Sequence, residues 1–194
     1  MAEVFSVFIT GVGGQGILLA SKVLSEVARL SGADVKKSEV HGMAQRGGSV
    51  VGHVKFGPVV HSPIIAKGEA DVILAFEKLE VMRHIEALKP GGKIVVNDQE
   101  IPPAPVAAGL MDYPEDIWDR IKAVASDAKK IDGAKLAREA GTVRATNIVL
   151  LGALSEYLSF SDDLWLEAIK ICVPPKFLDI NVGAFKAGQK AIEA

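Results

Sequence analysis

The stretch VFSVFITGVGGQGILLAS, residues 4–21, decides the fold of this chain. Residues 4–10 alternate in polarity and are rich in β-branched and aromatic side chains, which predicts a strand. From residue 17 onward, apolar residues recur at helical spacing until the Ser-Gly pair at 31–32, which predicts a helix. The glycine-rich segment 11–16 lies between them, in the context that a dinucleotide-binding loop requires. Its glycines either let the backbone approach a phosphate or serve only a tight turn and close helix–strand packing.

Strand and helix signals alternate along the rest of the chain, which predicts an α/β fold. We expect three α/β/α layers, with a Rossmann-like, mainly parallel sheet and helices on both faces. The length suits a single domain over residues 1–194. Strands are predicted over 33–40, 47–57, 59–65, 70–76 and 93–98, with 121–126 a further candidate, and residues 101–116 read as a loop. Helices are predicted over 79–88 and 177–192. Asp132 is a good N-cap for short helices that break at Gly141, around residues 159–162 and at the proline pair 174–175.

Composition and charge exclude several classes of function. The net charge of −2 gives no general footprint for nucleic acid, and the apolar runs are shorter than the ~20 residues that span a bilayer. The N-terminus has no basic region of the kind that begins a signal peptide. Cys172 is the only cysteine, so a disulfide within the chain is excluded, and an iron–sulfur cluster needs about four thiolates. The histidine spacing indicates no metal site. We expect a cytoplasmic protein.

The segment EVHGMAQRGGSV, residues 39–50, is unusually rich in functional groups for a connector between two predicted strands. Between residues 35 and 56 the charge is +3, from Lys36, Lys37, Arg46 and Lys55 against Glu39. This segment is therefore the part of the chain that we expect to favour an anion.

A nicotinamide cofactor would require an acidic residue for its ribose near the end of the second strand. Glu39 is available, 23 residues after Gly16. The chain then continues into the glycine-rich loop and an extended hairpin rather than a crossover helix, so NAD is not favoured.

Three further segments accompany the glycine turn in this sequence: KSEVHGMAQRGGSVVGHVKFG, GEADVILAFEKLEVMRHIEALKPGGKIVVND and ATNIVLLGAL. Together these segments resemble the gamma domain of the 2-oxoacid:ferredoxin oxidoreductases, most closely the beta subunit of the indolepyruvate type. The resemblance implies a pyruvate/ketoisovalerate oxidoreductase gamma-type domain within a heteromeric enzyme of anaerobic metabolism. The expected reaction is oxidative decarboxylation of an arylpyruvate to an aryl-acetyl-CoA, with electrons passed to ferredoxin.

The same resemblance implies how cofactors and partners are divided. Thiamine diphosphate, magnesium and 4Fe-4S clusters are expected on a larger alpha subunit, and ferredoxin is reached through the complex. This chain is expected to hold no cofactor alone, to be inactive by itself, and to contribute coenzyme A binding and assembly. A homodimer of the isolated chain is left open.

The expected ligand-contacting residues come from the glycine turn and from the 39–49 loop. His41 and Arg46 are the candidates for catalysis: an imidazole carries protons near neutral pH, and a guanidinium binds phosphate or carboxylate in a bidentate manner. The candidates for coenzyme binding are Gly11, Gly13, Gly14, Gln15, Gly16, Gln45, Arg46, Gly47, Gly48, Ser49 and Asn147.

Two alternatives remain open at this stage. The first is a free-standing Rossmann-type NAD(P)-binding oxidoreductase that uses Gly11, Gly13, Gly16 and Glu39. The second is a pure assembly module, in which Arg46 pairs with Glu39 and the 39–49 loop is a scaffold at a subunit interface.

Overall fold

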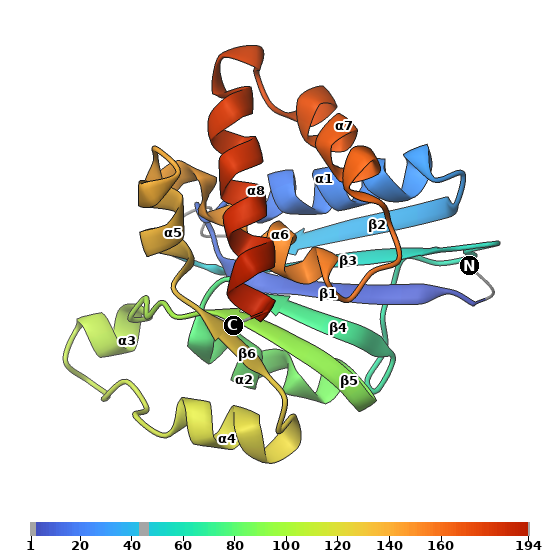
Figure 1. Cartoon of the computed structure of the whole chain (residues 1–194). Coiled ribbons are helices and arrows are strands. Elements are labelled where there is room, and N and C mark those ends of the chain that lie inside the picture. Colours follow the sequence, from blue (N-terminus) through green and yellow to red (C-terminus); the bar gives the residue numbers. More distant parts are fainter. Residues whose placement is uncertain (1–2, 43–46, 194) are drawn as a thin grey trace.

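The computed structural model describes residues 3–42 and 47–193 and shows a six-stranded sheet covered by helices on both faces (Figure 1). The strands are β1 Phe5–Val12, β2 Asp34–His41, β3 Ser49–Gly57, β4 Ala70–Ala75, β5 Leu88–Asn97 and β6 Lys129–Ile131. The α-helices are α1 Ile17–Leu30, α2 Lys78–His84, α3 Ala104–Ala107, α4 Ile117–Val124, α5 Gly133–Glu139, α6 Thr146–Ser155, α7 Asp162–Cys172 and α8 Leu178–Glu193. Short 3-10 turns are η1 Ile85–Ala87, η2 Val143–Ala145 and η3 Pro175–Phe177.

The strand order is β2-β3-β1-β4-β5-β6. The pairs β1–β4, β4–β5 and β5–β6 are parallel, whereas β3 runs antiparallel to both of its neighbours. The predicted α/β fold with a mainly parallel sheet is confirmed. A single reversed strand follows because β2 and β3 are joined by a short connection, and a parallel pair would have needed a crossover of a dozen or more residues.

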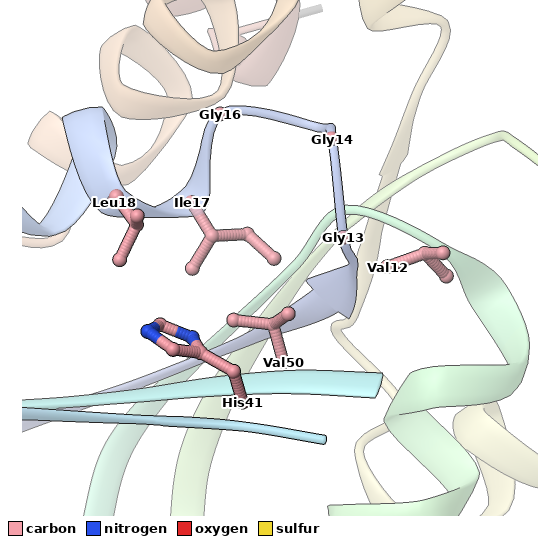
Figure 2. A pocket seen from close by; sticks show the side chains of 8 residues that line it. All are labelled: Val12, Gly13, Gly14, Gly16, Ile17, Leu18, His41 and Val50. Atoms are coloured by element: carbon pink, nitrogen blue, oxygen red, sulfur yellow. The ribbon is translucent and has the colours of Figure 1, made fainter. Parts of the chain in front are cut away.

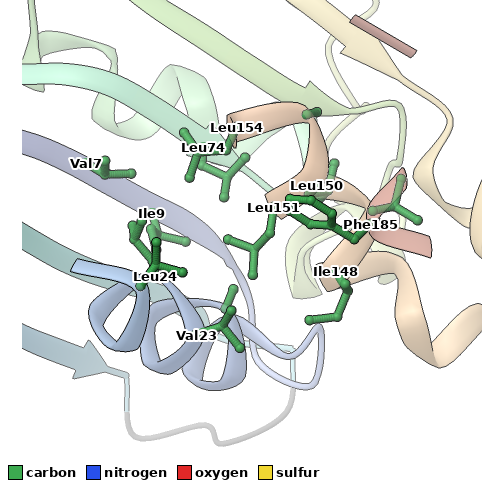
Figure 3. Close-up of a cluster of buried hydrophobic side chains, with 14 of the residues drawn as sticks. Val7, Ile9, Val23, Leu24, Leu74, Ile148, Leu150, Leu151, Leu154 and Phe185 are labelled. Atoms are coloured by element: carbon green, nitrogen blue, oxygen red, sulfur yellow. The ribbon is translucent and has the colours of Figure 1, made fainter. Parts of the chain in front are cut away.

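Alternation along the central strands divides the core between the two faces of the sheet. Val7, Val72 and Val95 belong to the cluster that includes α1, α6, α7 and α8. Figure 3 shows Val7 and Leu74 in this cluster, with Leu24 of α1, Leu151 of α6 and Phe185 of α8. Phe8 and Ile73, one position along, pack toward α2 and α4. Because both faces are buried, these strands read as nearly continuous apolar runs in the sequence.

Helix α6 lies in the centre of the larger layer, between the sheet and α8, and every residue from Asn147 to Ser155 is buried. Gly152 and Gly188 let the two helices approach closely. A Cβ built on Gly152 would lie 2.0 Å from the carbonyl oxygen of Phe185, and one on Gly188 would lie 1.8 Å from that of Val149. The close contact of α6 and α8 therefore requires glycine at both positions.

Two of the predicted strands are wrong. Residues 59–65 form an irregular connector, because the prolines at 58 and 63 remove backbone donors and its N–H groups bond to side chains instead. The candidate strand at 121–126 belongs largely to α4, whose Ile117 and Ile121 are one helical turn apart and buried on the sheet.

The predicted bounds of α1, β3, β4 and α8 agree with the structure to within two residues. The strand predicted over 93–98 begins earlier, at Leu88, the helix predicted over 79–88 ends as an α-helix at His84, the predicted loop 101–116 contains α3, and β6 was not predicted. Asp132 caps α5 as its position suggests, with its side chain accepting a hydrogen bond from the N–H of Lys135 at 2.9 Å. Across residues 3–42 and 47–193, no helix has the length and apolarity that crossing a membrane demands.

Candidate functional site

The candidate site lies at the edge of the sheet where β1, β2, β4, β5 and β6 end. Helix α1, which follows β1, packs on one face of the sheet, and α2, which follows the adjacent strand β4, packs on the other. Ligands of open α/β sheets bind in the crevice where the connections diverge in this way. The glycine turn after β1 stands at this point.

The glycine turn connects Val12 to the first residue of α1 through backbone conformations that favour glycine. Gly14 has φ 104° and Gly16 has φ 83°, and a Cβ built on Gly14 would meet nothing within 4 Å. Gly11 has a different role, because its Cβ would lie 2.7 Å from that of Phe76. The turn therefore presents bare backbone to solvent, while Gly11 lets β1 and β4 pack beneath it.

Gln15 holds the turn from within. Its Oε1 accepts a hydrogen bond from the N–H of Val12 at 2.7 Å, and its Nε2 donates to the carbonyl of Phe76 at 2.8 Å and to Oε1 of Gln99 at 3.1 Å. The Gln15 amide oxygen and nitrogen are thus both used within the protein. Among the candidate coenzyme-binding residues, Gln15 is placed at the site as a support for the turn.

Asn147 holds the turn from the other side, although it comes 131 residues later than Gly16. Its Nδ2 donates to the Gly16 carbonyl at 3.3 Å, and its Oδ1 accepts from the N–H of Ile148 at 3.0 Å. A Cβ on Gly16 would lie 2.8 Å from Asn147 Nδ2, so glycine is also needed there for this contact. Asn147 therefore ties the start of α6 to the start of α1.

On one side of the glycine turn lies a mostly apolar cleft of about 500 Å³, which we call the His41 cleft. Its walls include Ile17 and Leu18 of α1 and Val50 of β3, and Figure 2 shows the imidazole of His41 on the same side as these three. His41 ends β2 and pairs in register with Val50. The cleft combines apolar walls, an exposed imidazole and the backbone of the turn.

On the other side of the turn lies a second cleft of about 300 Å³, which we call the Arg144 cleft. It is formed where β4 and β5 end and where η2 and α6 begin, and its lining includes Gln99, Arg144 and Thr146. Gly14 and Gly16 line both clefts, so the two meet across the glycine turn.

Ser49 begins β3 and fixes its position at this edge. Its hydroxyl donates to Oε2 of Glu80 at 2.5 Å, and Glu80 is 4% exposed. The preceding glycines are joined to the turn: Gly13 N–H donates to the Gly48 carbonyl at 2.8 Å, and Gly47 N–H contacts the Gly13 carbonyl at 3.4 Å. Of the other residues proposed from this loop, Gln45 and Arg46 lie outside the described residues.

The lysines counted as an anion-attracting segment are paired in the structure. Lys36 binds Asp34 at 2.8 Å, and Lys55 binds Glu69 at 3.2 Å. Neither acid was included in the charge of residues 35–56, because Asp34 precedes that segment and Glu69 follows it. Lys37 binds Glu39 at 2.5 Å. The lysine charge that the sequence count attributed to the segment is therefore balanced locally.

Glu39 is held on its strand by two partners within the protein. Its Oε1 accepts hydrogen bonds from the hydroxyl of Ser21 at 2.6 Å and from Lys37. Partial burial opposes its ionisation, but these hydrogen bonds outweigh that cost, and the pKa of Glu39 is lowered. A carboxylate bound in this way fits a ribose ligand poorly.

Behind the site, Glu77 joins α2 to the 101–116 segment. Its carboxylate is 1% exposed and accepts from the N–H of Glu80, the N–H of Ile101 and the hydroxyl of Tyr113. Burial raises the pKa of Glu77, and these hydrogen bonds oppose that shift. Burial and the bond to Glu77 also raise the pKa of Tyr113. All these donors are satisfied by one carboxylate, which indicates a structural role.

Comparison with known proteins assigns this arrangement to a family. The family model described as pyruvate ferredoxin/flavodoxin oxidoreductase matches residues 6–191. The chain belongs to this family. It is a subunit of a 2-oxoacid:ferredoxin oxidoreductase complex and acts as an oxidoreductase within that complex.

Individual relatives extend over nearly the whole chain. The indolepyruvate oxidoreductase subunit IorB of Thermococcus kodakarensis is 44% identical over 96% of this chain and 95% of its own length. A keto/oxoacid ferredoxin oxidoreductase gamma subunit from Geobacter sulfurreducens has a TM-score of 0.72 at 23% identity, over 98% of this chain and 99% of that one. A 2-oxoglutarate:ferredoxin oxidoreductase from Magnetococcus marinus, solved with 2-oxoglutarate, coenzyme A and succinyl-CoA, has a TM-score of 0.73 at 19% identity, over 100% of this chain and 32% of that one. The two structures confirm the fold.

Three residues at the site were not predicted from the sequence: Gln99, Arg144 and Glu80. Gln99 follows the predicted strand 93–98, and the ends of parallel strands are where ligands bind, so its position carried a usable signal. Arg144 comes just before the segment ATNIVLLGAL, and nothing in the sequence indicated that it belongs to the site. Its position beside the glycine turn depends on how α6 packs. Glu80 reads as an ordinary surface acid of a short helix, yet it is buried against Ser49.

Proposed function

We propose that this chain is the smaller subunit of an indolepyruvate-type 2-oxoacid:ferredoxin oxidoreductase and that it forms the coenzyme A side of the active site. The observation that carries the proposal is the 44% identity, over almost the full length of both chains, with an indolepyruvate oxidoreductase subunit. We also propose that residues 1–194 form one domain and that the complex works in the cytoplasm.

Chemistry divides between this chain and a larger partner. Decarboxylation of a 2-oxo acid leaves an electron pair that must reach ferredoxin, and the acyl group must reach the sulfur of coenzyme A. Iron–sulfur clusters need about four thiolates each, and this sequence has one cysteine. We therefore assign the clusters to the larger partner, which also meets ferredoxin, and we assign thiamine diphosphate and magnesium to the same partner because the resemblance to the family implies it.

The described residues fit coenzyme A better than NAD. The glycine turn offers bare backbone between the His41 cleft, whose walls are mostly apolar, and the Arg144 cleft, whose lining includes Gln99, Arg144 and Thr146, which suits a ligand with an apolar arm and an anionic end. For NAD, the acid that would bind the ribose is already bonded to Ser21 and Lys37, and β2 leads into the antiparallel β3 instead of a crossover helix. These features support coenzyme A as the co-substrate.

Within this proposal, the His41 cleft receives the pantetheine arm and its thiol. The thiol loses its proton when the sulfur attacks the acyl carbon, and a neutral imidazole accepts protons near pH 7. His41 is the histidine that lines this cleft. It is our candidate for the proton acceptor.

The test uses the purified chain, the purified larger subunit and their co-purified complex, with a viologen dye as electron acceptor. We expect CoA-dependent dye reduction by the complex and none by this chain alone. Turnover by this chain without a partner would contradict the division of chemistry, and tight NAD binding that is lost in Glu39→Ala would favour the dehydrogenase alternative.

Replacing His41 tests its proposed role. His41→Gln should lower kcat of the complex by about a hundredfold or more and flatten its pH profile, with assembly intact. His61→Gln, at an exposed position of the 58–69 connector, is the matched control. If His41→Gln reduces co-purification and leaves kcat of the surviving complex normal, the residue belongs to an assembly surface and the catalytic role is wrong.

A further inference from the structure

A fixed hydrogen-bond network determines the orientation of the Gln99 amide, which lines the Arg144 cleft. Gln15 and Asn97 are the origin of that network. Val12 N–H must meet an oxygen, which fixes the Gln15 amide orientation, and Gly133 N–H likewise meets Oδ1 of Asn97 at 3.0 Å.

Both amides then present their nitrogens to Gln99. Gln15 Nε2 lies 3.1 Å and Asn97 Nδ2 lies 3.0 Å from Oε1 of Gln99. Because two donors meet the Gln99 oxygen, the orientation of its amide is determined, and its NH2 group is left without a partner among residues 3–42 and 47–193. Gln99 lines the Arg144 cleft, so this NH2 group is available to a ligand there.

Arg144 adds a positive charge to the same cleft. It is exposed, and within residues 3–42 and 47–193 it forms no ion pair. Carboxylates are absent from the described residues that line the cleft. A guanidinium and a fixed amide donor, with no opposing acid, favour an anion.

We infer that the Arg144 cleft is an anion subsite in which Arg144 and Gln99 bind a phosphoryl group of the ligand whose arm lies in the His41 cleft. The cleft of about 300 Å³ is large enough for a phosphoryl group with part of a sugar. Gly14, which has no side chain, lies between the two clefts and lets one ligand extend across both. The identification of that ligand as coenzyme A rests on the proposed function, whereas the anion preference rests on the donors alone.

Binding of inorganic pyrophosphate tests the subsite without requiring turnover. In calorimetry on the wild-type chain and its complex, at constant ionic strength, we expect pyrophosphate to bind and Arg144→Ala to weaken it about tenfold to a hundredfold. Arg144→Lys should recover part of the loss, because an ammonium cannot form the bidentate contact. Gln99→Glu keeps an acceptor for Gln15 but replaces the NH2 group by a carboxylate oxygen, so it should also weaken binding.

The matched control is Arg138→Ala, which removes the same charge from an exposed position in α5 outside both clefts. Equal losses in Arg138→Ala and Arg144→Ala would mean general surface charge and would overturn the subsite. So would unchanged pyrophosphate binding in an Arg144→Ala protein whose circular dichroism and Tm match the wild type.

Kinetics of the complex identify which anion is bound. We expect Arg144→Ala to raise the KM for coenzyme A about tenfold to a hundredfold while the KM for the 2-oxo acid stays constant. A higher KM for the 2-oxo acid alone would overturn the phosphoryl assignment in favour of a substrate carboxylate. If pyrophosphate binding depends on Arg144 but the wild-type complex needs no coenzyme A, the proposed function fails and the anion subsite stands.

Discussion

Gly188→Ala tests whether the close approach of α6 and α8 determines the stability of the fold. The new Cβ would lie 1.8 Å from the Val149 carbonyl oxygen, 2.8 Å from its carbon and 3.0 Å from the nitrogen of Ala153. A carbon–oxygen contact needs roughly 3.3 Å, so the helices would have to separate by roughly 1.5 Å. The obstacle is the backbone of α6, which no rotamer change relieves.

Overpacking a core costs about 1–3 kcal/mol, and a clash with helix backbone belongs at or above the upper end of that range. We therefore expect Gly188→Ala to reduce the free energy of unfolding by about 3 kcal/mol or more. For a domain of this size, that corresponds to a Tm lower by about 6–12 °C. Because Asn147 begins the same helix that would be displaced, its bond to Gly16 should weaken as well.

The assay is urea denaturation followed by circular dichroism, with thermal unfolding as a second measure. Gly183→Ala is the control on the same helix: it is exposed, and its Cβ would come no closer than 3.9 Å to that of Ala140. Alanine is the better helix former, so Gly183→Ala should leave stability unchanged or raise it by about 0.5–1 kcal/mol. If Gly188→Ala is as stable as Gly183→Ala, the reasoning about helix contact is refuted.

Two further predictions concern side chains near the site. Ser49→Ala removes the donor to buried Glu80 and should reduce the free energy of unfolding, measured by urea denaturation, by about 1.5–3 kcal/mol. Ser159→Ala, at an exposed position, is the control and should be nearly neutral. A loss below about 0.5 kcal/mol for Ser49→Ala would mean that the bond does not anchor β3. Burial, together with the charges of His84 and Lys55, lowers the pKa of His53, whose Nδ1 accepts from the N–H of Ile65 at 3.2 Å. The unfolded chain then binds more protons below about pH 6.5, so the free energy of unfolding should fall as the pH falls through that region. His53→Asn should make this dependence shallower and His61→Asn should not; equal slopes in both variants would contradict the role of His53.

The sequence by itself determined the features that neighbouring residues control. The strand–glycine turn–helix unit at 4–30 follows from local periodicity and from the absence of side chains in the turn. The cap at Asp132 and the helix breaks near residues 141, 160 and 174 also follow from local chemistry. The motif content of four segments was enough to assign the family, which the full-length match confirms.

Local patterns failed where a segment had two allowed conformations. IKAVAS has the apolar content of a strand, and only the contact of Ile117 and Ile121 with the sheet shows that it is part of a helix. Residues 59–65 have strand-like composition, but prolines and the side chains of Asp34 and His53 take them out of the sheet. Tertiary contacts decided both.

Only the tertiary structure decided how the polar groups are used. Gln15 and Gln99 are 84 residues apart and Asn147 is 131 residues from Gly16, yet these contacts shape the glycine turn. Lys55 was included in the net charge of residues 35–56, but the fold pairs it with Glu69. Arg144 lies beside the glycine turn because of the way α6 packs. The physical reason is the strand order β2-β3-β1-β4-β5-β6, which places the ends of strands from distant parts of the sequence side by side. The partner of each polar side chain at this edge depends on that order.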